Sequence, residues 1–256
     1  MDKSTIAGIV LAVGGILVGL LLEGGKVAQV LQPTAALIVF GGTLGAVMVQ
    51  FPLATVIQAF RRLTYVFFDR AEDPGKLIQE MVLFAVRARK NGIVSLDSEL
   101  PNIKEPFLQK ALTLAVDGVE PEELRKMMEL DLDNEAERSE KVAQVFESAG
   151  GFAPTIGIIG AVLGLIQVMQ HLANIDAVGR GIAVAFVATI YGVGSANLIF
   201  LPSAGKLKIK AREEQVVREM TLEGVISILE GVNPRILETK LLGYFEEQKQ
   251  TETQPA

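Results

Sequence analysis

The sequence contains no cysteine and a single histidine, His171. Without thiols, a disulfide framework, a thiolate nucleophile and a cysteine-ligated zinc site are all excluded. One imidazole cannot form a histidine cluster around a metal, and we expect His171 to be an interfacial residue at a helix end. We therefore predict neither a metal site nor a cofactor.

Charge is missing from long parts of the chain. Asp, Glu, Lys and Arg are absent from Ser4–Leu22, Val27–Phe60, Ser148–Ile175 and Gly181–Gly205. A soluble domain alternates charged and apolar residues, whereas a bilayer core of roughly 30 Å demands about 20 consecutive uncharged residues. The sequence therefore predicts a polytopic membrane protein, and a single soluble globule is excluded.

The first window is longer than the apolar region of a signal peptide, and it ends at Glu23 without a small-residue cleavage site. We interpret it as a retained span. The four predicted spans cover residues of about 5–22, 33–51, 152–172 and 180–201.

The basic residues predict the orientation of these spans. Residues 53–147 hold 13 Lys and Arg and residues 203–256 hold 8, whereas the short links 23–32 and 173–180 hold only Lys26 and Arg180. Because cytoplasmic flanks are enriched in Lys and Arg, both large charged regions and both termini are expected in the cytoplasm. The net charge of −6 does not suggest nucleic-acid binding, and the sequence has no basic stripe interleaved with aromatics, so no nucleic-acid partner is expected.

The expected organisation is all-α. A hairpin of spans (1–52) precedes a cytoplasmic helical domain (53–147), a second hairpin (148–202) and a cytoplasmic helix and tail (203–256). Within the insert, apolar residues recur at helical spacing up to Asn91-Gly92, and further helices are expected after Pro106 and from Pro121, the last running to the membrane boundary near Ser148.

In the last region, a helix is expected from Ser203 to about Gly231, and a disordered polar tail from Gln248. In the first hairpin, small residues predict faces for close helix packing. These are Gly8, Gly14, Gly15, Gly19, Gly41, Gly42 and Gly45.

Spans three and four are rich in glycine and hydroxyl residues. Gly157, Gly160 and Gly164 follow at i, i+3 and i+7 on one helix face. One interpretation is tight helix packing, with the hydroxyls of Thr155, Thr189 and Ser195 bonded to carbonyls of their own helices. Alternatively, the two helices together line a groove for another helix or a hydrated path.

No span contains an ionisable Asp, Glu, Lys or Arg. If ions cross the membrane here, the carboxylate that binds them must come from a partner chain. A self-sufficient pump or secondary transporter is therefore disfavoured. An enzyme is also disfavoured, because the sequence has no nucleophile–base constellation and no phosphate-binding loop.

The motifs together resemble the MotA/PomA flagellar stator family, within the MotA/TolQ/ExbB superfamily. The resemblance covers nearly the whole chain up to about Gln248 and includes the N-terminal double-glycine hairpin. Its main segments are Ala153-Pro154-Thr-Ile-Gly157-Ile-Ile-Gly160-Ala161, the run from Gly181 to Gly192, Asn197, Pro202-x-x-x-Lys206-Leu-Lys208 and the run from Arg87 to Asp97.

The resemblance implies an ion-driven rotary motor in the bacterial inner membrane. Subunits of this kind surround MotB-like single-span chains as a ring of five, embedded in lipid, and the partner supplies the ion-binding aspartate. Spans three and four would face that partner. The implied ion pathway and partner interface comprises Pro154, Thr155, Gly157, Gly160, Ala161, Gly164, Thr189 and Tyr191.

The resemblance also implies that the cytoplasmic insert turns the rotor through FliG. Arg89 and Asp97 match the family's charged rotor contacts, with Arg87 and Lys90 as auxiliaries; a solvated helix end is the alternative. Pro154 and Pro202 match the family's two prolines, which would couple ion flow to motion by bending a helix. For Pro202 the alternative is that it only ends a helix.

In sodium-driven relatives a threonine of span three and one of span four lie near the partner aspartate. Here Thr189 keeps the second hydroxyl, but Ala161 occupies the first position and cannot coordinate a dehydrated cation. A proton is therefore favoured over sodium. Two other functions stay open: an ExbB/TolQ-like energiser of the outer membrane, disfavoured by four spans with the insert after the second, and a non-conducting membrane scaffold.

Overall fold

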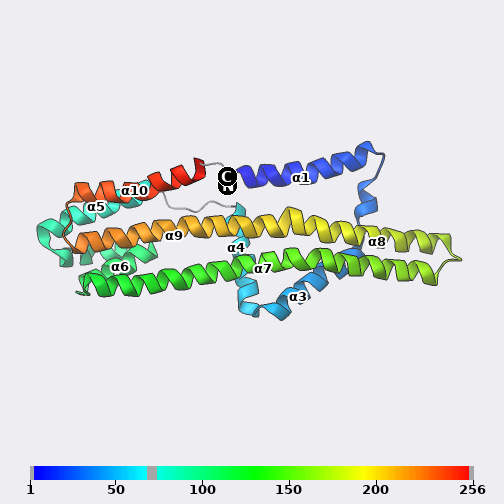
Figure 1. Cartoon of the computed structure of the whole chain (residues 1–256), viewed down its shortest axis with the longest axis horizontal. Helices are drawn as coiled ribbons and strands as arrows, with labels where there is room; N and C mark the ends of the chain where they lie inside the picture. Colours follow the sequence, from blue (N-terminus) through cyan, green and yellow to red (C-terminus); the bar gives the residue numbers. More distant parts are fainter. Residues whose placement is uncertain (1–2, 68–73, 254–256) are drawn as a thin grey trace. The chain divides into compact units, whose positions relative to one another are not determined.

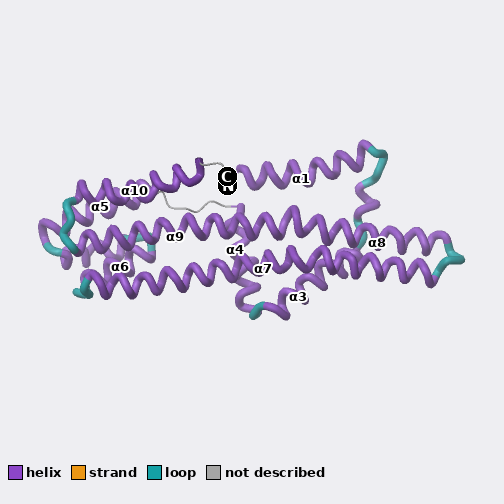
Figure 2. The backbone as a smooth tube through the Cα atoms, in the orientation of Figure 1, coloured by secondary structure: helices purple, strands orange, loops and turns teal. Residues whose placement is uncertain are grey.

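The computed structural model describes residues 3–67 and 74–253 (Figure 1). Within these ranges every regular element is helical, as predicted, and no strand occurs (Figure 2). The elements are α1 (Lys3–Leu22), η1 (Val27–Val30), α2 (Pro33–Ala36), η2 (Leu37–Gly41), α3 (Gly42–Gln50), α4 (Leu53–Phe67), α5 (Pro74–Asn91), η3 (Ile93–Asn102), α6 (Pro106–Val116), α7 (Pro121–Gln170), α8 (Ile175–Ser195), η4 (Ala196–Phe200), α9 (Leu201–Leu229) and α10 (Pro234–Thr253).

Four helical stretches are long and apolar enough to cross a membrane. They are Ser4–Leu22, Val27–Gln50, and windows within Pro121–Gln170 and Ile175–Leu229. The predicted four-span architecture is therefore confirmed. The helices that contain spans three and four are much longer than a bilayer is thick, because each continues into a charged segment.

Both predicted coupling prolines lie inside continuous helices. α7 runs unbroken for 50 residues through Pro154. After α8, the π-helical turn η4 leads directly into α9, and the N–H of Leu201 bonds to the carbonyl of Ala196, five residues back. The expected helix boundary at Ser203 is therefore wrong: Pro202 lies in the first turn of α9 and does not end a helix.

The chain divides into two compact units, which are described separately. The span unit comprises Met1–Asp69 and Ser139–Ile209, and the insert unit comprises Arg70–Arg138 and Lys210–Ala256. Val56 and Ala59 of α4 pack in one cluster with Val142 and Phe146 of α7, so the ends of the charged segments belong to the span unit.

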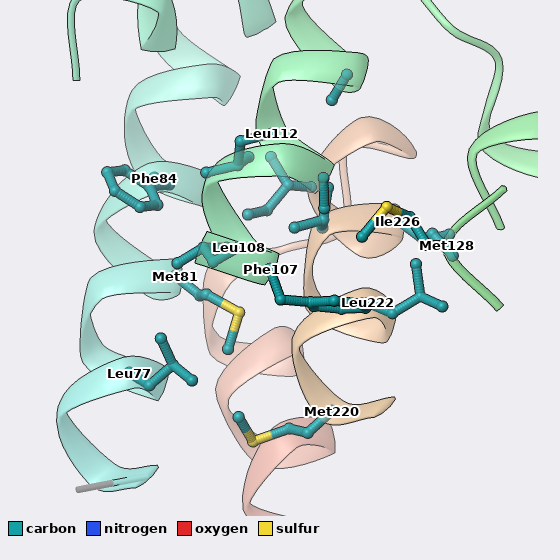
Figure 3. Packing of buried hydrophobic residues seen from close by; sticks show 14 of the residues in the cluster. Leu77, Met81, Phe84, Phe107, Leu108, Leu112, Met128, Met220, Leu222 and Ile226 are labelled. Atoms are coloured by element: carbon teal, nitrogen blue, oxygen red, sulfur yellow. The ribbon is translucent and has the colours of Figure 1, made fainter. Parts of the chain in front are cut away.

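The insert unit has its own hydrophobic core. Side chains from α5, α6, α9 and the first part of α7 converge there, among them Met81, Leu108, Met128 and Ile226 (Figure 3). Asn91 ends α5 as predicted, and Gly92 adopts a φ of 82°, which glycine tolerates best. The 3₁₀ segment η3 that follows was not expected from the sequence.

The glycines of the first span do not pack inside this chain. A Cβ placed on Gly8, Gly14, Gly15 or Gly19 would meet nothing within 4 Å. The predicted packing face of this helix is therefore unused within the chain. In span two, by contrast, a Cβ on Gly42 would lie 2.8 Å from Cγ2 of Ile156, so α3 approaches α7 closely.

The C-terminal segment is helical further than expected. α10 continues to Thr253, beyond the predicted start of a disordered tail at Gln248. Glu, Gln and Lys, which prevail in this segment, are good helix formers, and a polar composition alone does not prevent a helix. The remaining residues of the expected tail, 254–256, lie outside the described ranges.

Candidate functional site

α7 and α8 pack backbone against backbone in the span unit, alongside each other in Figure 1. A Cβ on Gly157 would lie 2.9 Å from the carbonyl oxygen of Ala188, and one on Gly164 would lie 2.7 Å from that of Gly181. In the reverse direction, a Cβ on Gly192 would lie 2.5 Å from the carbonyl oxygen of Ala153. Only glycine fits at these contacts.

Small residues on α8 complement those of α7. Gly181, Ala185, Ala188 and Gly192 are buried and follow at i, i+4, i+7 and i+11, which places them on one helix face. This face is not among the predicted site residues, although its helical spacing can be read from the sequence. The glycines of α7 that were predicted to line a pathway are thus in contact with α8 of the same chain.

Other side chains of the two helices are exposed and are not covered by the rest of the chain. On α7 they are Thr155, Ile159, Val162 and Ile166, and on α8 and the following turn η4 they are Phe186, Ile190, Val193 and Asn197. Each set repeats at helical spacing and is mostly apolar. Each helix therefore presents an exposed face suited to lipid or to another membrane helix.

The hydroxyls of the span unit bond within their own helices. Thr155 Oγ1 donates to the carbonyl of Phe152 at 2.8 Å, Thr189 Oγ1 to that of Ala185 at 3.2 Å, and Ser195 Oγ to that of Gly192 at 3.3 Å. Thr155 is exposed, whereas Thr189 and Ala161 are half-buried. Each hydroxyl oxygen keeps lone pairs that can still accept a hydrogen bond.

Tyr191 joins α8 to the first hairpin. Its hydroxyl donates to the carbonyl of Val30 at 2.6 Å and accepts from the N–H of Gln32 at 3.2 Å. Its ring stacks on Phe40, with centroids 5.9 Å apart. The side chain is therefore engaged with the connection between the first two spans. The resemblance to the stator family implies a place for Tyr191 in the ion pathway, and no sequence pattern indicates its contact with the first hairpin.

The two prolines lie next to small or apolar groups of the facing helix. A Cβ on Gly192 would lie 3.2 Å from Cα of Pro154, and one on Gly150 would lie 2.6 Å from Cδ2 of Leu201, the neighbour of Pro202. Since proline has no N–H, the carbonyl of Gly150 lacks the donor that an α-helix normally supplies four residues on. Pro202 is exposed.

The charged residues predicted to face the rotor lie at the end of α5 and in η3, within the insert unit. Arg87 forms an ion pair with Glu99. Arg89, Lys90 and Asp97 are exposed. A surface groove of about 490 Å³ lies beside them. It is lined by Glu80, Leu83, Phe84, Val86, Arg87, Lys90, Asn91, Glu99 and Asn102.

A second charge cluster in the insert unit centres on Glu223 of α9. Its carboxylate pairs with Arg125 of α7 at 2.9 Å and with Lys240 of α10. Burial acts to raise the pKa of Glu223, but the hydrogen bonds from Lys240 and Arg125 outweigh it and hold the pKa below its ordinary value. No sequence signal identified this cluster, because its members are far apart in the chain.

Residues 3–67 and 74–253 contain no group of three or more side chains that could hold a metal ion. The chemistry of the described chain is therefore that of packed helices, hydroxyls and surface charges.

Comparisons with known proteins agree with this architecture. Residues 6–92 match the family model for the motility protein A N-terminal region, and residues 99–220 match that of the MotA/TolQ/ExbB proton channel family. Motility protein A of Bacillus subtilis is 37% identical over 96% of this chain and 91% of its own length. PomA of Vibrio alginolyticus is 31% identical over 97% of each chain.

Two solved structures are also similar. A chain of the C. jejuni MotAB structure matches with a TM-score of 0.89 and 35% identity, covering 95% of this chain and 96% of its own. A chain of the flagellar MotAB stator complex from Bacillus subtilis matches with a TM-score of 0.86 and 35% identity over 99% and 100%. The chain therefore belongs to the MotA/TolQ/ExbB proton channel family, in its motility protein A branch, and is a multi-pass membrane stator subunit of the bacterial flagellar motor.

Proposed function

We propose that this chain forms an ion channel with a MotB-like single-span partner, whose membrane helix supplies the ion-binding aspartate. The observation that supports this most strongly is that none of the four apolar windows contains Asp, Glu, Lys or Arg, so no side chain of these types is available to bind an ion within the spans. A channel that moves ions through hydrocarbon needs such a group, so a second chain must bring it. The similar solved structures are of MotAB complexes.

The partner helix would lie against the open faces of α7 and α8. The buried glycine contact fixes these two helices to each other and leaves Thr155 on one exposed face and Ile190 on the other. Thr189, half-buried beside that face, keeps an acceptor oxygen for a partner carboxyl group. In this arrangement Gly157, Gly160 and Gly164 do not line the pathway; they allow α7 and α8 to pack closely on the side away from the partner helix.

Several copies of the chain would surround the partner as a ring of five in the inner membrane. The first span supports self-association, because a Cβ placed on Gly8, Gly15 or Gly19 would meet nothing within 4 Å, which leaves room for a neighbouring helix to approach the backbone. Both termini would lie in the cytoplasm, since the Lys and Arg residues are concentrated in the insert and the C-terminal region.

The translocated ion would be a proton. At Ala161 there is no side-chain oxygen to replace the hydration shell of sodium, and Thr155 lies six residues earlier, nearly two helical turns away. A protonated partner carboxyl group is neutral and needs no such shell. Passage of the proton would drive rotation, and the insert would turn the rotor protein FliG through Arg89, Lys90 and Asp97.

The partner and the ion can be tested together. The chain is coexpressed with a MotB-like chain, and internal pH is followed after an acid pulse. We expect acidification that disappears when the partner's membrane aspartate is replaced by asparagine. Swimming speed at fixed pH should not change when sodium is removed. Loss of rotation without sodium, restored by adding it, would instead show a sodium motor.

A further inference from the structure

Spans two and four each contain an irregular backbone segment, and span three contains a proline within a regular helix. Span two contains the π-helical turn η2 (Leu37–Gly41), and span four the π-helical turn η4 (Ala196–Phe200). Span three contains Pro154 inside α7. In hydrocarbon, irregular backbone is tolerated only where protein or water satisfies the polar groups that it frees.

Thr43, two residues after η2, is buried with 3% of its surface exposed. Among the described residues its Oγ1 has no hydrogen-bond partner. This is unusual, because a threonine in a helix can bond to the carbonyl four residues back. Leaving a hydroxyl unpaired in a protein interior is unfavourable, because it loses its hydrogen bonds to water and gains none, so this group is expected to have a partner.

Thr43 lies between two residues that pack against other spans. Val39 and Val47 are four residues before and after it along the helix. Val39 belongs to the same buried cluster as Val187 and Ala188 of α8, whereas Val47 belongs to the same cluster as Ala149 of α7. Thr43 is therefore flanked along span two by an apolar cluster shared with α8 and by another shared with α7.

The contacts of α3 with α7 place Thr43 at the depth of Pro154. Gly42 lies against Ile156, and Val47 belongs to the cluster of Ala149. Residues at the level of Thr43 therefore lie between 149 and 156 on α7. This interval contains the carbonyl of Gly150, which has lost its helical donor to Pro154.

Span four contributes a third polar group at this level. Ser195, directly before η4, is 6% exposed, and its single long bond to its own helix leaves it free to accept another. Gly192 lies against Ala153, and Leu201 against Gly150, so Ser195 falls between these two contacts.

We propose that Thr43 Oγ1, the carbonyl oxygen of Gly150 and Ser195 Oγ bind an internal water molecule where spans two, three and four meet. Buried waters make about three hydrogen bonds to polar groups that otherwise lack partners. A water here can accept from one hydroxyl and donate to the freed carbonyl and to the second hydroxyl oxygen. The site does not depend on which ion the motor uses.

Electron cryomicroscopy of the intact complex, at a resolution that shows ordered solvent, tests the site directly. We expect density within about 2.7–3.2 Å of Thr43 Oγ1 and of at least one of the other two groups. The site would be refuted if no solvent density lay beside Thr43 Oγ1, or if the Thr43 hydroxyl instead donated to the carbonyl of Val39.

Thr43→Val keeps the shape of the side chain and removes the hydroxyl. If a water is bound, the variant should lose its density and the melting temperature of the complex should fall by about 2–4 °C. An unchanged or higher melting temperature would show that the hydroxyl was merely unpaired and would overturn the proposal.

Thr221→Val is the matched control. Thr221 is 1% exposed and bonds to the carbonyl of Val217 in its own helix at 2.7 Å, so its loss should leave the density at Thr43 unchanged. Thr43→Ser, which retains the hydroxyl, should retain the water and tests the site even if the valine variant does not assemble. A serine variant without the water would also overturn the proposal.

Discussion

Tyr191 and Val30 are 161 positions apart, yet the tyrosine hydroxyl donates to the valine carbonyl at 2.6 Å. The same oxygen accepts from the N–H of Gln32. The connection between the first two spans is thus attached by one side chain to the C-terminal part of α8. This contact fixes the start of span two against the helix that contains Thr189.

Tyr191→Phe should loosen this connection without disturbing the stacking on Phe40. The variant loses two hydrogen bonds and leaves the carbonyl of Val30 without its donor, a loss of about 1–2 kcal/mol. Hydrogen exchange of the purified protein should show faster exchange at residues 27–32. Unchanged exchange there would show that the tyrosine contributes only its ring.

Gly192→Ala should disrupt the hairpin of α7 and α8. The new Cβ would lie 2.5 Å from the backbone oxygen of Ala153, and a backbone atom cannot rotate away. We expect a loss of stability of at least about 1–3 kcal/mol, which is the usual effect of overpacking. Less of the variant should therefore accumulate in the membrane. Gly194→Ala, two residues along the same helix, meets nothing within 4 Å and should accumulate normally. Equal accumulation of the two variants would argue against close packing at Gly192.

The sequence predicted those parts of the fold that depend on neighbouring residues. The charge-free windows located the four spans, and Asn91-Gly92, Pro106 and Pro121 located helix ends in the insert, because spans and helix ends have local signals. The contact of Tyr191 with Val30 had no such signal, since it depends on a partner far along the chain. The glycine pattern of α7 was visible, but the sequence alone could not distinguish packing within the chain from packing against a partner.

Glu223 should make the insert unit sensitive to acid. Its pKa in the folded protein lies below its ordinary value, so its stabilising contribution is fully present above that ordinary value and is lost as the pH falls through the folded-state pKa. Glu223→Gln should therefore melt below the wild type at pH 7, and the difference should shrink in acid below about pH 4. Glu238→Gln, on the exposed surface of α10, is the control and should show no such convergence.

Pro154→Ala should yield a complex that inserts and assembles but generates little torque. Alanine restores an N–H opposite the carbonyl of Gly150 and straightens a point where α7 can bend. Rotation of tethered cells at normal expression measures this. Normal torque would count decisively against a coupling role for the proline.

Charge reversal at Arg89 should impair swimming while leaving assembly intact, because this side chain is exposed and its contribution to folding is small. An opposite reversal on FliG should restore part of the motility. Arg87→Glu should behave differently, since it also breaks the ion pair with Glu99 and disturbs η3. Unchanged motility in single and double reversals at Arg89 and Asp97 would refute the rotor assignment.

The unbroken course of α7 restricts how this protein can vary in length. Each residue inserted into an α-helix turns everything beyond it by about 100° and advances it by 1.5 Å. A single insertion between Gly157 and Gly164 would therefore turn one of these glycines away from its contact with α8. Seven inserted residues leave an angular error of only about 20°, but they advance the contacts that follow by about 10.5 Å. A length change within the packed part of α7 should thus be tolerated only when α8 changes by the same number of residues.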